Sequence, residues 1–207
     1  MKEIDYSLYV ITENNPALGI THLQVATNAI EGGATIIQLR DKKAAGNEIM
    51  GIGKEIKSLC QEGGCSFIIN DDVEVALEID ADGVHLGQSD MLLKEARRLV
   101  PSDMVIGVSA TSYKEARAAF YEGADYIGVG PIFETTSKDD ANAPIGLTAL
   151  KKICEEINIP VIAIGGITLQ NVTDLKKAGV DGVAVISAVS RAKNMVLATK
   201  VLAEAIK

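Results

Sequence analysis

Eight short apolar segments recur along the chain, and a longer stretch with apolar residues at helical spacing follows each of them. Strands and helices that alternate in this way build a parallel sheet from βα units. The segments are mostly β-branched and nearly continuous in hydrophobicity, as strands covered on both faces are. We predict strands at residues 6–11, 35–39, 66–69, 83–86, 105–108, 126–129, 161–164 and 182–186.

The number of units decides between two parallel architectures. An open doubly wound sheet of about five or six strands would leave units over, whereas eight units close a barrel. Helical spacing over residues 45–61 and 112–122 supports the same order. The chain has 207 residues, of which 47% are hydrophobic, and this suits one core. The predicted fold is a single α/β domain, a (β/α)₈ TIM barrel spanning residues 1–207.

Charge and composition limit the partners of this chain. Its 20 basic and 28 acidic side chains give a net charge of −8, without the basic surface that nucleic acids or anionic membranes attract. No run approaches the roughly 20 apolar residues of a membrane span, and the acidic start differs from a secretory signal. Three cysteines at irregular spacing indicate thiols in a reducing compartment. We expect small-molecule substrates, no nucleic acid, no membrane and a cytoplasmic location, and leave a homo-oligomer open.

The second predicted strand ends in a basic and polar segment, Gln38-Leu39-Arg40-Asp41-Lys42. In a barrel, active-site groups come from the carboxyl ends of the strands. Alternation along the strand puts Gln38 and Arg40 on one face and carries Lys42 over the same rim. A guanidinium beside an ammonium suits a diphosphate. The alternative is a solvated basic rim.

Acidic residues follow the next two strands, with Asn70-Asp71-Asp72 after the third and Asp90 after the fourth. Carboxylates completed by water and phosphate oxygens are usual ligands of Mg²⁺. We predict Asp71 and Asp90 as metal ligands. Asp72 is open between this role and capping the next helix, and capping is the alternative for the whole cluster.

Hydroxyl groups follow the fifth and sixth strands. Ser109 is positioned to donate a hydrogen bond into the mouth of the barrel. The loop at residues 131–144 contains three hydroxyls ahead of a lysine, namely Thr135, Thr136, Ser137 and Lys138. Such a loop can bind a phosphate or close over a substrate, and a plain solvated loop is the alternative.

Paired glycines and a serine follow the last two strands. Gly165-Gly166 comes after the seventh and Ile186-Ser187 ends the eighth. Glycines let backbone amides approach a ligand, and the loops after strands seven and eight of a barrel frequently form a phosphate site. Amide dipoles bind an anion without formal cations, so the negative net charge is no obstacle. The alternative is that the glycines only form a tight turn.

Taken in order, these segments resemble the motifs of the thiamine phosphate synthase family along nearly the whole chain. Each motif is weak alone, but seven in register are specific. They lie at 38–42, 70–72, 85–90, 107–109, 128–133 with 138, 164–167 and 186–188. The resemblance implies a transferase of thiamine biosynthesis. It would join an aminopyrimidine diphosphate to a thiazole phosphate, or to its carboxylated precursor, with Mg²⁺ and release of pyrophosphate.

The resemblance also implies roles for the residues. The pyrimidine diphosphate would be bound by Gln38, Leu39, Arg40, Asp41, Lys42, Asn70, Ser109 and Lys138. The thiazole phosphate would be bound by Thr135, Thr136, Ser137, Gly166, Ile186 and Ser187. Asp71 and Asp90 would hold Mg²⁺, and Arg40, Lys42 and Lys138 would be catalytic.

Our hypothesis for the reaction is dissociative: cations neutralise the departing diphosphate, the aminopyrimidine stabilises a methylene cation, and the thiazole nitrogen captures it. Such a path needs charge stabilisation and alignment rather than a protein nucleophile. It needs no general base, so we predict His85 as structural and His22 as an ordinary surface or packing residue. Two positions depart from the family, since Thr111 stands where a histidine is usual and Ser137 where threonine is common.

Three rival functions stay open. The related thiazole tautomerase has a catalytic histidine where this chain has Pro131. A non-catalytic sensor of phosphate ligands would not need the predicted metal carboxylates. A third rival is another phosphate-binding barrel, such as an enzyme of tryptophan synthesis, in which basic residues at 40 and 42 beside Asn70 and Asp71 would not be expected. The fold alone could not separate these functions.

Overall fold

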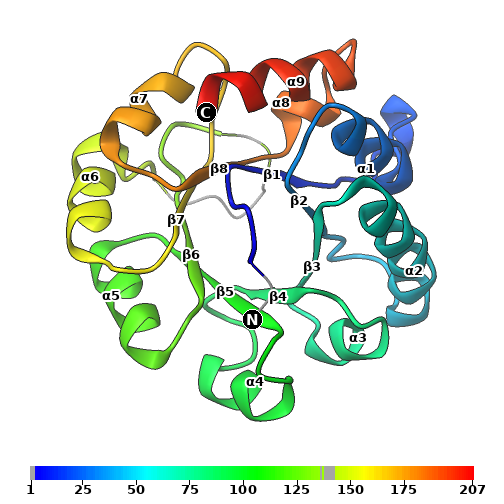
Figure 1. Ribbon diagram of the computed structural model, residues 1–207, viewed down its shortest axis with the longest axis horizontal. Coiled ribbons are helices and arrows are strands. Elements are labelled where there is room, and N and C mark those ends of the chain that lie inside the picture. Colours follow the sequence, from blue (N-terminus) through cyan, green and yellow to red (C-terminus); the bar gives the residue numbers. More distant parts are fainter. Residues whose placement is uncertain (1–2, 136, 138–142) are drawn as a thin grey trace.

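Eight parallel strands close into one barrel in chain order, from β1 to β8 and back to β1 (Figure 1). The computed structural model describes residues 3–135, 137 and 143–207. The strands are β1 (Leu8–Ile11), β2 (Ile36–Leu39), β3 (Ser66–Asn70), β4 (Gly83–Leu86), β5 (Val105–Ala110), β6 (Tyr126–Val129), β7 (Val161–Ile164) and β8 (Gly182–Val185). The predicted (β/α)₈ barrel is confirmed.

Helices form the outer ring around the barrel (Figure 1). They are a short 3₁₀ helix η1 (Pro16–Leu18), α1 (His22–Glu31), α2 (Gly46–Gly63), α3 (Val73–Glu78), α4 (Leu93–Leu99), α5 (Tyr113–Glu122), α6 (Gly146–Glu156), α7 (Val172–Ala178), α8 (Ser187–Ser190) and α9 (Met195–Ile206). Both α8 and α9 follow β8. In the part of the chain that the structure describes, no helix is long and apolar enough to cross a membrane.

Side-chain caps explain where several helices begin. The Asp72 carboxylate accepts a hydrogen bond from the amide of Val75 at 2.9 Å, so Asp72 is the N-cap of α3. Ser112 caps α5 in the same way through the amide of Glu115. A side-chain oxygen at this position satisfies an amide that the first helical turn leaves without a partner. The role left open for Asp72 is therefore settled in favour of capping.

The first strand begins two residues later than the pattern predicts. The amide and hydroxyl of Ser7 both donate to the carboxylate of Asp5, which holds residues 5–7 in a local turn. Tyr6 then leaves the sheet, and its ring packs on that of Tyr126 with centroids 5.1 Å apart. The N-terminal segment (dark blue in Figure 1) thus lies across one end of the barrel.

The strands read as continuous apolar runs because both of their faces are buried. Leu8 and Val10 of β1 belong to the core between sheet and helices, whereas Tyr9 and Ile11 point into the barrel interior. The interior core is small and includes Tyr126. The three cysteines keep their thiol groups, as expected.

Candidate active site

A cavity of about 1070 Å³ opens at the carboxyl ends of the strands. Loops after β2 to β8 contribute to its wall, as the position of active sites in barrels leads one to expect. The predicted site residues that line it are Arg40, Lys42, Asn70, Asp71, Asp90, Ser109, Thr135, Ser137, Gly166, Ile186 and Ser187. The structure thus brings together side chains that are up to 147 positions apart, from Arg40 to Ser187.

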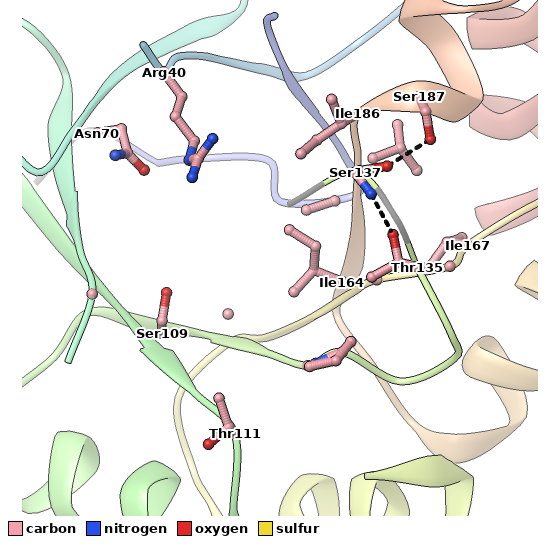
Figure 2. A pocket seen from close by; sticks show the side chains of 18 of the residues that line it. Arg40, Asn70, Ser109, Thr111, Thr135, Ser137, Ile164, Ile167, Ile186 and Ser187 are labelled. Atoms are coloured by element: carbon pink, nitrogen blue, oxygen red, sulfur yellow. Dashed lines mark hydrogen bonds between the residues drawn. The ribbon is translucent and has the colours of Figure 1, made fainter. Parts of the chain in front are cut away.

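The cavity has two chemically different sides. Figure 2 shows Arg40 and Asn70 on one side and Ser137 and Ser187 on the other. The first side also carries the acidic pair described below, and it comes from β2, β3 and β4. The second side comes from the loop after β6 and the start of α8 and presents hydroxyl groups.

Three predicted residues do not line the cavity. The Gln38 side chain is buried in the barrel, where its Nε2 donates to the Tyr9 hydroxyl at 2.6 Å. Leu39 points the opposite way, into the core between sheet and helices, because neighbours on a strand alternate. Asp41 lies on the rim, where its carboxylate accepts hydrogen bonds from neighbouring backbone amides. Thr136 and Lys138 lie outside the described residues.

Asp41 is held by His22, a contact that the sequence did not reveal. His22 is buried, with Nδ1 2.7 Å from Oγ1 of Thr12 and Nε2 3.2 Å from Oδ2 of Asp41. Partial burial alone would raise the Asp41 pKa, but hydrogen bonds from the Lys43 amide and His22 outweigh it, and this pKa lies below its usual value. His22 is thus a buried packing residue that fixes the loop after β2, not a surface residue.

The acidic pair consists of Asp71 and Asp90. Burial raises the Asp71 pKa to about 6, and the adjacent Asp90 carboxyl adds to this rise, while the charges of Lys42 and Arg40 oppose it. Oδ2 of Asp90 accepts a hydrogen bond from the amide of Gly87 at 2.7 Å. Adjacent carboxyls such as these repel each other when both are ionised. Among the described residues, no group of three or more His, Cys, Asp or Glu side chains could hold a metal ion.

The backbone turns sharply at Asp71. Its φ angle is +65°, a left-handed conformation that aspartate tolerates better than most residues. Its amide donates to the carbonyl of His85 at 2.8 Å, so the pairing of β3 with β4 continues up to this residue. The turn directs the chain from β3 into α3 and leaves the Asp71 side chain at the cavity.

Hydroxyl groups meet on the opposite side of the cavity (Figure 2). Oγ of Ser137 lies 2.8 Å from Oγ of Ser187, and the amide of Ser137 donates to Oγ1 of Thr135 at 3.2 Å. Ser187 is the first residue of α8, where the backbone amide has no partner within the helix. Hydroxyls and first-turn amides together can donate to an anion.

The paired glycines pack two loops together. Gly166 has a φ angle of +65°, and a Cβ on it would lie 2.4 Å from the carbonyl oxygen of Glu134. The missing side chain therefore lets the loop after β7 approach the loop after β6. Gly166 also lines the cavity, so this packing determines the wall of the hydroxyl side.

Thr111 also lines the cavity, at the position where the sequence departs from the family pattern. Its amide and its hydroxyl both donate to Oε2 of Glu115, at 2.6 and 2.8 Å. Since its one hydroxyl proton is used in this contact, Thr111 offers a ligand at most the lone pairs of its oxygen.

His85 makes hydrogen bonds with both ring nitrogens. Nδ1 lies 3.0 Å from the hydroxyl of Tyr126, and Nε2 lies 2.9 Å from Oγ of Ser109. These contacts agree with the structural role predicted for His85. They also link Ser109, which lines the cavity, to the interior of the barrel.

Comparison with known proteins gives a consistent result. Residues 8–189 match a family model described as thiamine monophosphate synthase. A thiamine-phosphate synthase from Methanocella arvoryzae is 46% identical over 197 residues, which cover 95% of this chain and 93% of that protein. One from Methanospirillum hungatei is 46% identical over 201 residues, covering 97% and 98%.

A solved structure shares both the sequence pattern and the fold. It is the thiamine phosphate pyrophosphorylase from Pyrococcus furiosus, with 42% identity and a TM-score of 0.89. The match covers 98% of this chain and 96% of that one. The likeness therefore extends over nearly the whole of both chains.

Proposed function

This chain belongs to the thiamine monophosphate synthase family and is a transferase, and we propose that it joins an aminopyrimidine diphosphate to a thiazole phosphate to give thiamine phosphate and pyrophosphate. The thiazole phosphate or its carboxylated precursor is the acceptor. A location in the cytoplasm and self-association of the chain stay predictions.

The observation that carries this proposal is that two chemically unlike sets of side chains, one cationic and one of hydroxyl groups, line one cavity. Arg40 and Lys42 line the side near β2, and the hydroxyls of Ser137 and Ser187 line the side near α8. Formal cations suit the higher charge of a diphosphate, and hydroxyls with amides suit a single phosphate. A reaction that joins two phosphorylated molecules needs both sites to face one space.

We further propose that Asp71 and Asp90 hold Mg²⁺. The fit rests on their chemistry: the two carboxyls are in contact, burial and the neighbouring Asp90 raise the Asp71 pKa, and a divalent cation held by these residues would relieve their repulsion. Two protein oxygens leave room for water and diphosphate oxygens, as is usual for Mg²⁺. When bound there, the ion would neutralise charge on the diphosphate.

The chain's own residues then have two tasks. Arg40 and Lys42, with Lys138 as a predicted third cation, neutralise the diphosphate as the bond to the pyrimidine methylene breaks. The Ser137 and Ser187 hydroxyls hold the thiazole by its phosphate, so that its ring nitrogen is aligned with the methylene carbon. No protein nucleophile takes part, because the nitrogen of the second substrate forms the new bond.

The decisive experiment measures both products together. Purified protein is incubated with the pyrimidine diphosphate, the thiazole phosphate and Mg²⁺, and a parallel sample contains EDTA. We expect thiamine phosphate and pyrophosphate in equal amounts, with neither formed in EDTA. Folded protein that forms no thiamine phosphate would refute the proposal, and conversion of a thiazole isomer in the same sample would point to a tautomerase.

A further inference from the structure

A chain of hydrogen bonds runs through the barrel interior beneath the cavity. It starts at Gln38, whose Nε2 donates to the Tyr9 hydroxyl at 2.6 Å. The Tyr9 hydroxyl lies 3.0 Å from that of Tyr126, which in turn lies 3.0 Å from Nδ1 of His85. The chain ends at Ser109, whose Oγ lies 2.9 Å from Nε2 of His85 and which lines the cavity.

The amide nitrogen of Gln38 fixes the direction of this chain. Because that nitrogen can only donate, the single proton of the Tyr9 hydroxyl is directed to Tyr126. The Tyr126 proton is then directed to Nδ1 of His85. A neutral imidazole that accepts at Nδ1 carries its proton on Nε2, so His85 donates to Ser109.

Both tyrosines keep the protons that this direction requires. Tyr9 and Tyr126 are buried, and burial is the main reason that the pKa of each hydroxyl is raised above its usual range. Neither hydroxyl therefore ionises at physiological pH, and each stays a donor.

Ser109, at the end of the hydrogen-bond chain, can donate the hydrogen bond that the ligand proposed for this side of the cavity requires. Diphosphate oxygens accept hydrogen bonds but do not donate them, so Ser109 is useful only if its own proton faces the ligand. It can do so when its oxygen accepts the proton of His85. In Figure 2 the Ser109 oxygen faces the open space of the cavity. The backbone of Ser109 is also held, since Nε2 of Gln88 donates to its carbonyl at 2.6 Å.

We propose that Tyr126 is a positioning residue: it holds His85 in the tautomer with the proton on Nε2, so that the hydroxyl proton of Ser109 points at the diphosphate. This role rests on the proposed function, since it assigns Ser109 to the pyrimidine diphosphate. Tyr126 itself does not line the cavity and acts only through His85.

The tautomer of His85 tests the hydrogen-bond chain directly and independently of activity. The protein has two histidines, so nitrogen-15 NMR of the imidazole rings gives two sets of signals, which a His22→Gln variant assigns. We expect His85 to carry its proton on Nε2. In Tyr126→Phe, which keeps the ring but removes the donor to Nδ1, a share of His85 should move its proton to Nδ1. Protonation on Nδ1 in the unaltered protein, or no change in Tyr126→Phe, would overturn the proposal.

Steady-state kinetics test whether the hydrogen-bond chain strengthens binding of the pyrimidine diphosphate. Tyr126→Phe should raise the KM for the pyrimidine diphosphate by about 3- to 10-fold, the equivalent of one hydrogen bond, and leave the KM for the thiazole phosphate unchanged. In a Ser109→Ala background it should have no further effect. Tyr121→Phe is the matched control, because Tyr121 lies exposed on α5.

An equal rise of both KM values, or additive effects of Tyr126→Phe and Ser109→Ala, would mean that Tyr126 only stabilises the barrel. The two proposals fail separately. Without any coupling of the substrates the proposed function falls, whereas the tautomer of His85 still decides the direction of the hydrogen-bond chain.

Discussion

Oγ of Ser137 lies 2.8 Å from Oγ of Ser187, and this contact joins the loop after β6 to the start of α8. If both hydroxyls bind the thiazole phosphate, Ser187→Ala removes a donor to a charged oxygen. Such a bond contributes about 1.5–3 kcal/mol, so the KM for the thiazole phosphate should rise roughly 10- to 100-fold. The KM for the pyrimidine diphosphate should stay near its original value. Steady-state kinetics with each substrate varied in turn measure this.

The control for Ser187→Ala is Ser102→Ala. Ser102 is exposed in the connection between α4 and β5, at the end of the barrel remote from the cavity. Its substitution should change neither KM. An unchanged KM for the thiazole phosphate in Ser187→Ala would remove that serine from the phosphate site.

Lys42 and Asp71 test the diphosphate side. On the proposed mechanism, Lys42→Ala removes a cation that stabilises the leaving group, and Asp71→Ala removes half of the proposed metal site. Each should lower kcat by about 100-fold or more, because electrostatic stabilisation of the transition state supplies most of the rate enhancement in a reaction of this kind. Circular dichroism and thermal melting should show folded protein. Lys43→Ala is the matched control, since Lys43 is exposed and does not line the cavity. Near-normal turnover in both Lys42→Ala and Asp71→Ala would contradict the assignment.

Gly107 makes the space that Tyr126 occupies. A Cβ on Gly107 would lie 2.0 Å from Cζ of Tyr126, so alanine must displace that ring. Overpacking of this kind costs about 1–3 kcal/mol, and we expect Gly107→Ala to lower the free energy of unfolding by that amount. Urea denaturation measures it. Gly51 is the control: it is exposed in α2 with no atom within 4 Å of a Cβ, so Gly51→Ala should stabilise the protein by about 0.5–1 kcal/mol. Equal stability of the two variants would mean that the interior accommodates the methyl group.

Glu13 ties the loop after β1 to the region of α8. It accepts hydrogen bonds from Ser190 at 2.8 Å and from two nitrogens of Arg191 at 3.1 and 3.2 Å. Partial burial alone would raise the Glu13 pKa, but the contacts with Arg191 and Ser190 outweigh it, and the pKa lies below its usual value. The carboxylate is thus favoured in the folded protein, and Glu13→Gln should lower stability by about 1 kcal/mol at neutral pH.

The pH dependence of that loss has a definite sign. A carboxyl whose pKa is lowered by folding contributes its full stability above the unfolded pKa of about 4.3, and this contribution disappears as the pH falls through the folded pKa. The difference in unfolding free energy between the original protein and Glu13→Gln should therefore shrink below about pH 4. Glu204→Gln, on the exposed face of α9, should show no difference at any pH. A difference that persists in acid would assign the effect to packing rather than charge.

Much of the fold could be predicted from short segments of the sequence, because local residue patterns determine where strands begin and end. Strand β6 and strand β7 begin and end at the predicted residues, because apolar β-branched runs bounded by glycine, proline or acids leave few other conformations. The rim position of Arg40 and Lys42 follows from the same pattern, since polar residues that directly follow a barrel strand lie at its mouth. Local chemistry also explains the cap by Asp72, although two roles stayed open until the structure placed its side chain.

Contacts between distant residues had no signal in the sequence. Nothing in the pattern links Tyr9 to Tyr126, which are 117 positions apart, or His22 at the start of α1 to Asp41 in the loop after β2. The two tyrosines meet only when the barrel closes and inward side chains of different strands share one interior, and His22 meets Asp41 only when α1 packs beside the loop after β2. The sequence by itself determined the eight units, their order and the chemistry offered at the rim. The tertiary structure decided which groups touch. A hydrogen bond requires its donor and acceptor to be placed to within a few tenths of an ångström, and periodicity in the sequence does not encode positions with that precision.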